Sequence, residues 1–241
     1  MDVTIPAAAR AESSISGRRV LDGVFLAGAV VATLWNGFGS GHLAVASKLV
    51  PMGALIVRLA LALRAAEVDR RMGAALLFGL VASAVGDVVI AYVFVGGIAA
   101  FLVAHLAYLA AMGRPRGRPL SHVLAALPAA AIGGTMGWIL VAGGRVPAPL
   151  LVPVAVYMTV ISTMLARAAG RAFVEVRTRE SYLLVAGAAV FVLSDALIAL
   201  SRWVVDIPYP KLAILATYFA AQRLLVAGVD PAGRPARPAA A

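Results

Sequence analysis

Two aspartates lie well inside long apolar stretches, an uncommon place for an ionisable side chain. Asp87 follows LFGLVASAVG, and Asp195 follows VAGAAVFVLS. Of the eleven acidic residues, only these two lie so deep in such a stretch. A carboxyl group in an apolar environment costs free energy and usually marks function. Two carboxyl groups in different surroundings can serve as an acid and as an ionised partner, so acid–base chemistry is the first candidate.

Six further polar side chains lie within apolar stretches: Lys48, His105, Tyr108, Tyr157, Tyr218 and Gln222. At the ~1.5 Å rise of a helix, most of this set and both aspartates fall roughly 9–15 Å below one membrane surface. We therefore predict one polar layer, with Asp87 and Asp195 as catalytic groups and the other six as substrate-binding groups. Each also has a structural alternative, because helices use the same residue types to bond one another. Arg58 is left out because its long side chain can reach the cytoplasmic face.

The composition decides which elements must position these groups. Of the 241 residues, 62% are hydrophobic and 13% are charged, whereas a soluble domain has about 45–50% apolar and roughly 25% charged residues. The chain therefore has lipid as its solvent. It contains no cysteine and three histidines, so we expect no disulfide, no metal site and no cofactor.

Eight stretches approach the roughly 20 apolar residues that cross a bilayer: 20–36, 42–63, 72–93, 96–112, 120–142, 147–168, 181–203 and 210–228. We predict an all-α, polytopic membrane helical bundle with eight transmembrane helices. This divides the chain into a cytoplasmic segment at 1–19, a transmembrane domain at 20–228 and a disordered, proline- and alanine-rich cytoplasmic tail at 229–241.

Positive charge alternates between the two sides of this predicted bundle. Of the 21 Lys and Arg residues, sixteen flank helix ends on one side and three on the other, Lys48 and Arg58 being inside a span. The three are Arg145, Arg202 and Lys211. Because positive loops stay in the cytoplasm, both termini are predicted to be cytoplasmic. The net charge of +10 then reflects membrane orientation, and we expect membrane lipids and no nucleic acid as partners.

Residues 77–91 resemble residues 185–199, and each segment contains one of the two aspartates. Four helices per half would make the halves parallel repeats about an axis along the membrane normal. The alternative is that two apolar helices resemble each other by composition alone.

Four segments in combination resemble the YhhN/lysoplasmalogenase family. GLVASAVGDVVIAYVFVGGIAAFLVAHLAYLAAM at 79–112 carries a Gly-Asp pair and then Phe, His and Tyr, and PVAVYMTVIS lies at 153–162. VFVLSDALIALSRWVVDIPYPKLAILATYFAAQRLLVAG at 190–228 carries Ser-Asp, Thr-Tyr and Gln, and SKLVP lies at 47–51. In many members the Lys and Pro of this last element are adjacent, whereas two residues separate them here.

The resemblance implies an eight-span hydrolase that cleaves the vinyl ether bond of lysoplasmalogens to a fatty aldehyde and a glycerophospho-alcohol. This cleavage begins with protonation of the alkenyl β-carbon and gives an oxocarbenium ion. In our hypothesis one aspartate, with Asp195 favoured, is kept protonated by desolvation and donates that proton, while the other stays ionised and stabilises the cation. Lys48 would bind the head-group phosphate or favour the ionised Asp, and the other polar groups would orient water and the glycerol oxygens.

Two other function classes fit the same residues. A small-solute or proton-coupled transporter also uses intramembrane acids and internal repeats. A lipid-binding or scaffold protein would tolerate loss of both acids. Arg greatly outnumbers Lys and Ala is abundant, which is typical of a high-GC bacterium, so we expect a multi-pass protein of the inner membrane.

Overall fold

The computed structural model describes residues 7–143 and 145–230. Every regular element in this part of the chain is helical. The elements are α1 (Ala7–Phe38), α2 (His42–Ser47), α3 (Leu49–Arg64), α4 (Arg70–Val89), α5 (Phe94–Ala111), α6 (Pro119–Ala142), α7 (Ala148–Gly170), the π-helical turn η1 (Arg171–Glu175), α8 (Arg179–Trp203) and α9 (Pro210–Ala227). The all-α prediction is confirmed.

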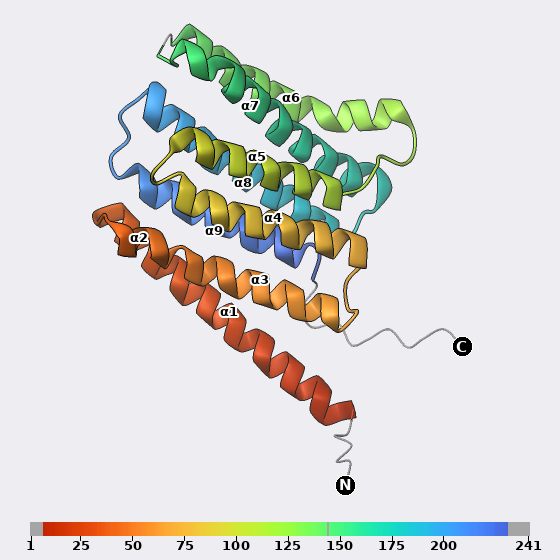
Figure 1. Ribbon diagram of the computed structural model, residues 1–241. Helices are drawn as coiled ribbons and strands as arrows, with labels where there is room; N and C mark the ends of the chain where they lie inside the picture. The colour runs from red at the N-terminus through yellow and green to blue at the C-terminus, as the bar shows by residue number, and fades with distance from the viewer. Residues whose placement is uncertain (1–6, 144, 231–241) are drawn as a thin grey trace.

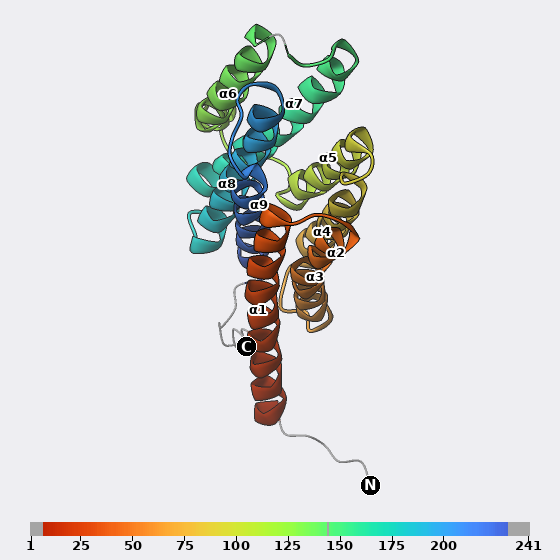
Figure 2. The same cartoon turned by 90° about the vertical axis from the view of Figure 1, so that its left-hand side faces the viewer.

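Seven long helices form a closed, flattened ring. Neighbours around the ring are α1, α3, α4, α5, α7, α8 and α9, and α9 returns to α1. Figure 1 shows these helices running side by side with α1 at one edge, and Figure 2 shows that the ring has two layers. The closest packing is within the pairs α4–α5 and α8–α9. These pairs carry the two aspartates.

Helix α6 lies outside the ring and packs almost entirely on α7 (Figure 1). Its apolar side chains are largely exposed, Leu120, Leu127 and Trp138 among them. Seven segments of the described chain are long and apolar enough to cross a membrane, and α6 is one of them. The exception among the long helices is α9, whose 18 residues span about 27 Å, close to the thickness of a hydrocarbon core. The chain is therefore a polytopic membrane bundle of seven to eight spans.

Local sequence explains where several helices begin. Asp69 caps α4 by accepting a hydrogen bond from the Met72 amide at 2.8 Å, and Thr178 caps α8 through the Ser181 amide. Proline stands in the first turn of α6, α7 and α9, where its missing N–H is not needed.

The predicted helix at 42–63 is interrupted. It divides into α2 and α3 at Lys48, which lies in a turn between them. Pro51 is the cause, because proline cannot donate to the carbonyl four residues earlier and its ring crowds that carbonyl. Because two residues separate Lys48 from Pro51, the break falls at the lysine. The Lys48 side chain is directed toward Asp87 of α4.

The structure describes only part of the two predicted terminal segments. Helix α1 begins at Ala7, well before the expected start at residue 20, so most of the predicted cytoplasmic segment is helical. Val229 and Asp230 are buried against the bundle. The rest of the predicted tail, 231–241, lies outside the described residues, as does 1–6.

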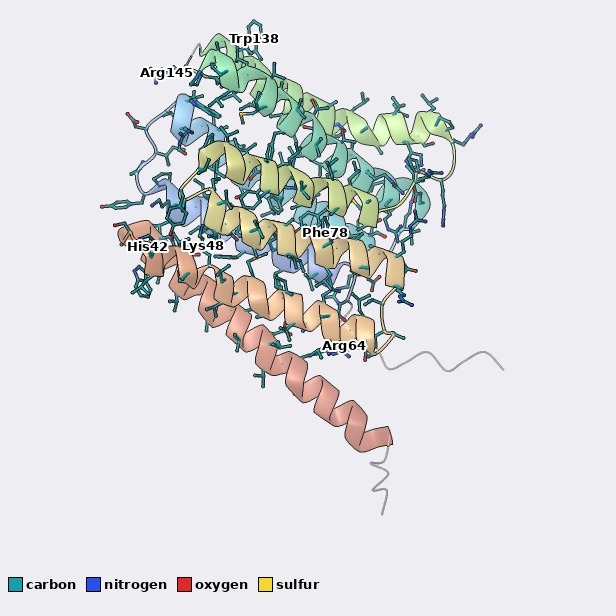
Figure 3. All side chains as sticks on the ribbon, viewed as in Figure 1. His42, Lys48, Arg64, Phe78, Trp138 and Arg145 are labelled. Carbon is teal, nitrogen blue, oxygen red and sulfur yellow. The ribbon has the colours of Figure 1, made fainter. Side chains whose placement is uncertain are left out.

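Arg58 corrects a second expectation. Its side chain is 1% exposed and does not reach the surface. Its guanidinium lies 2.8 Å from Asp22 of α1 and 3.1 Å from Asp230 beyond α9. The side chain does not extend to the cytoplasmic face because two carboxylates pair with it inside the bundle. Figure 3 shows His42 and Lys48 near one end of the bundle and Arg64 at the other; we call these the His42 end and the Arg64 end.

Glycine lets α4 and α5 approach closely. A Cβ at Gly79 would lie 2.2 Å from the Tyr108 ring, and one at Gly86 would lie 3.0 Å from Phe101. Small residues at such interfaces allow close helix packing in membranes. The same contacts fix the ring of Tyr108, one of the predicted site residues.

Candidate active site

A cavity of about 620 Å³ lies among the helices at the His42 end and extends to α6. Every described helix except α3 and the η1 turn contributes to its lining. Its walls are mostly apolar, with Ile98, Phe101, Met136 and Val154 among them. Its polar groups include Lys48, Asp87, Tyr157, Asp195 and Tyr218. An apolar cavity with a few convergent polar groups is typical of a site for a small ligand.

Asp87 is held by a lysine and a tyrosine from other helices. The Lys48 ammonium lies 3.6 Å from Asp87 Oδ1 and also donates to the Asp87 backbone carbonyl. Tyr218 Oη donates to Asp87 Oδ2 at 2.6 Å. Both members of the ion pair are buried, and together with Tyr218 they join the α2–α3 turn, α4 and α9.

Asp195 has a different environment. Tyr157 Oη donates to Asp195 Oδ2 at 2.7 Å, and His105 Nε2 lies 3.3 Å from the same oxygen. His105 Nε2 is also 2.8 Å from Tyr157 Oη. Among the described residues no hydrogen bond reaches Asp195 Oδ1, which leaves that oxygen available to a ligand in the cavity.

One aromatic ring separates the two aspartate clusters. Phe191 packs edge-on against His105 at 4.6 Å and against Tyr218 at 5.6 Å between ring centroids. The connections cross between the helix pairs, because His105 of α5 contacts the aspartate of α8 and Tyr218 of α9 contacts the aspartate of α4. This exchange is compatible with the predicted repeat of two parallel halves.

A second polar layer lies behind the cavity. Tyr108 Oη donates to Gln222 Oε1 at 2.8 Å and lies 3.0 Å from Ser83 Oγ. All three residues are fully buried. They bond α4, α5 and α9 to one another, which is the interhelical alternative that the sequence left open for Tyr108 and Gln222.

The predicted site residues thus divide into two groups. Those that line the cavity are Lys48, Asp87, Tyr157, Asp195 and Tyr218. His105, Tyr108 and Gln222 are absent from the described lining. Of these three, His105 belongs to the site through its contact with Asp195. Tyr108 and Gln222 instead bond together the helices that carry the site residues.

Several polar lining residues were not predicted. Asn36, His42, Arg202 and Lys211 are among them, and the His42 ring nitrogen lies 2.6 Å from Tyr92 Oη. A signal for the two cations was present in the charge pattern, because the predicted outer side has three positive loop residues. Two of them line the cavity.

The arrangement can carry out acid–base chemistry on an amphiphilic ligand. Two carboxyl groups face one cavity with different partners, a cation for Asp87 and hydrogen-bond donors for Asp195. Within the described residues, no three His, Cys, Asp or Glu side chains are grouped as a metal site requires.

Fold and site together define a polytopic helical membrane protein with a carboxyl-lined cavity among its spans. The chain belongs to the YhhN family, whose sequence profile matches residues 43–229. The matched region begins within α2 and ends just after α9, so it includes all eight predicted site residues, whereas the lining residues Asn36 and His42 precede it.

Three curated relatives are similar to this chain. Lysoplasmalogenase TMEM86B of Sus scrofa is 31% identical over 76% of this chain and 74% of its own length. Lysoplasmalogenase TMEM86B of Homo sapiens is 33% identical over 61% of this chain and 59% of its own length. Lysoplasmalogenase TMEM86A of Bos taurus is 33% identical over 61% of each chain. No solved structure matches this chain significantly.

Proposed function

We propose that this protein is a lysoplasmalogenase, a hydrolase that cleaves the vinyl ether bond of a lysoplasmalogen to a fatty aldehyde and a glycerophospho-alcohol. Its membership of the YhhN family and the names of its relatives support this activity. The observation that carries the proposal is the single cavity that Asp87 and Asp195 both line, each with different partners. The substrate is a lysophospholipid of the membrane, and the protein is placed in a bacterial inner membrane with both termini in the cytoplasm.

The chemistry requires one proton donor and one water molecule. Protonation of the alkenyl β-carbon consumes the C=C π electrons and gives an oxocarbenium ion. Water then adds to the α-carbon and loses a proton, which forms a hemiacetal. Collapse of the hemiacetal breaks the bond to the glycerol oxygen, which takes the hydroxyl proton, and releases aldehyde and alcohol. The proton lost by water restores the acid, so the enzyme needs no other reactant.

Asp195 is the proposed acid. Tyr157 donates to Oδ2, as it would to the carbonyl oxygen of a neutral carboxylic acid, and Oδ1 is left for the transferable proton. With its proton on Nε2, His105 donates to Tyr157, which donates to Asp195. This chain of hydrogen bonds holds the acid in one orientation.

Asp87 is the proposed ionised partner. The Lys48 ammonium is close enough to stabilise a carboxylate, and the Tyr218 hydroxyl adds a charge-assisted hydrogen bond. A fixed negative charge facing the cavity stabilises the developing oxocarbenium ion. Lys48 is thus assigned to Asp87 and not to the phosphate of the head group.

Aldehyde release by purified protein in detergent tests the proposal. We expect the protein to release aldehyde from 1-alkenyl lysophospholipid and not from the saturated 1-alkyl analogue, which cannot form the oxocarbenium ion by protonation. Asp195→Asn and Asp87→Asn should each lower kcat about a thousandfold, while Asp206→Asn, a change at an exposed aspartate of the α8–α9 loop, should leave it unchanged. Absence of aldehyde from the unaltered protein in detergent, with solute uptake in sealed vesicles, would favour a transporter instead.

A further inference from the structure

We propose that Arg202 and Lys211 form a phosphate-binding subsite at the mouth of the cavity, which recognises the phosphodiester of the lysophospholipid head group. This inference rests on the proposed function and extends it to substrate recognition. Both cations line the cavity, and both are exposed at the His42 end. Arg202 comes from the last turn of α8 and Lys211 from the first turn of α9, so the loop between these helices places both charges at the same end of the bundle.

Lys48 cannot serve this purpose in the observed arrangement. Its ammonium is buried, donates to the Asp87 carbonyl and is paired with the Asp87 carboxylate. Moving it to a phosphate would leave a buried carboxylate without its cation, which is costly. The head group therefore requires another cation, and the exposed pair at the mouth can bind it with less loss of existing contacts.

The spacing along α8 suits a glycerophospholipid. Arg202 follows Asp195 by seven residues, so it lies on the same helix face about 10.5 Å along the axis. In the substrate the vinyl ether and the phosphate are attached to opposite ends of one three-carbon glycerol unit. A substrate with its vinyl ether at Asp195 and its head group toward the mouth would direct its phosphate at the Arg202 side chain.

Arg202 is prepared for an anion by its stacking partner. Its guanidinium carbon lies 3.9 Å from the centre of the Phe94 ring. Stacking on an aromatic face holds the guanidinium by its plane and leaves its N–H groups at the edge free to make paired bonds to phosphate oxygens. Lys211 adds a flexible point charge, and the positive end of the α9 dipole lies at the same place. Asp206 in the same loop is exposed and does not belong to the described lining.

Substrates with and without phosphate test the subsite. We compare 1-alkenyl glycerophosphoethanolamine with 1-alkenylglycerol, which has the same vinyl ether and no phosphate. Arg202→Gln/Lys211→Gln should raise KM for the phospholipid about tenfold with little change in kcat, and should leave KM for the alkenylglycerol unchanged. Arg145→Gln is the matched control, because Arg145 is an exposed cation at the same end, bonded to the Val204 carbonyl and outside the described lining.

Binding measurements separate this inference from the proposed activity. Calorimetry in detergent with the saturated 1-alkyl lysophospholipid needs no turnover, and the double variant should bind it about tenfold more weakly while binding 1-alkylglycerol as before. Inhibition by glycerophosphoethanolamine but not by inorganic phosphate would assign the site to the lipid head group. Equal weakening for ligands with and without phosphate, or no weakening for either, would overturn the subsite. A missing aldehyde signal with intact discrimination in binding would overturn the activity alone.

Discussion

Buried charges occur at both ends of the bundle, but they are used differently. At the Arg64 end, Arg58 is shared between Asp22 and Asp230, and Arg223 lies 3.2 Å from Asp22. These groups neutralise one another. At the His42 end the two aspartates face a cavity, and Asp195 has an oxygen with no partner among the described residues.

The difference shows that an ionisable residue inside a span does not by itself identify a functional site. Arg58 is more deeply buried than Asp195, yet its contacts are ion pairs between elements. The distinguishing property is a carboxyl group that faces empty volume. The two ends should therefore respond differently to mutation, stability being lost at one and catalysis at the other.

The largest effect on stability is expected from Arg58→Met. This change leaves Asp230 buried next to fewer cations, and removal of one member of a buried pair typically costs about 3–5 kcal/mol. Unfolding in mixed micelles would measure the loss. Arg64→Met, at an exposed residue of the same helix end, should stay within about 0.5 kcal/mol. The kcat of the folded Arg58 variant should equal that of the unaltered protein, and a large fall in kcat would remove the distinction between the ends.

A second prediction concerns the cation at the other end. Lys48→Met removes the partner of Asp87, so the ionised carboxylate is no longer favoured and kcat should fall about a hundredfold. Steady-state aldehyde release measures this. If Lys48 acts through Asp87, adding Lys48→Met to Asp87→Asn should cause little further loss. Additive losses would assign Lys48 a separate role.

The third prediction concerns the hydrogen bonds from His105 through Tyr157 that orient Asp195. Tyr157→Phe removes the donor to Oδ2 without changing the ring, and we expect a roughly tenfold fall in kcat from the loss of one hydrogen bond to the acid. Tyr182→Phe is the control, since Tyr182 is exposed near the start of α8. Because the phenol acts through Asp195, the pH dependence of kcat should also move in Tyr157→Phe. A fall in kcat with an unaltered pH profile would contradict the positioning role.

The smallest effect is a pH dependence of stability at the Arg64 end. Burial raises the pKa of the Asp230 carboxyl, against the opposing influence of Arg58 and Arg18. The folded state then binds a proton more tightly than the unfolded state, so this group's contribution is present at low pH and is lost as pH rises through the raised pKa. The difference in unfolding free energy between Asp230→Asn and the unaltered protein should therefore increase in favour of the variant across that range. A difference independent of pH would refute this assignment.

Much of the fold followed from the chain's composition and apolar runs. Sixty-two per cent hydrophobic residues exclude a water-facing domain, and the length of each run predicts a crossing helix. The helix boundaries were less accurate, as the start of α1 and the break at Lys48 show. Proline at position 51 was visible, but a proline inside a membrane helix can either kink the helix or divide it, and the structure shows that it divides this one.

Depth along a helix predicted the members of the polar layer, because the rise per residue is constant. Five of the eight predicted residues line the cavity, and His105 contacts one that does. Depth carries no information about rotation around the helix axis. For that reason Tyr108 and Gln222 could not be separated from the lining residues. Arg202 and Lys211 lie at helix ends, outside the predicted layer, and depth alone did not select them.

The sequence alone determined that the chain is a helical membrane protein with two intramembrane carboxyl groups. Ionisable side chains are costly in lipid and therefore rare in membrane spans, so each one can be recognised in an apolar stretch. Tertiary structure alone decided that Lys48 and Tyr218 belong to Asp87, that Tyr157 and His105 belong to Asp195, and that Arg58 belongs to neither. These pairings join residues far apart in the chain, and they arise only when the ring closes and the packing of small residues sets how each helix is turned.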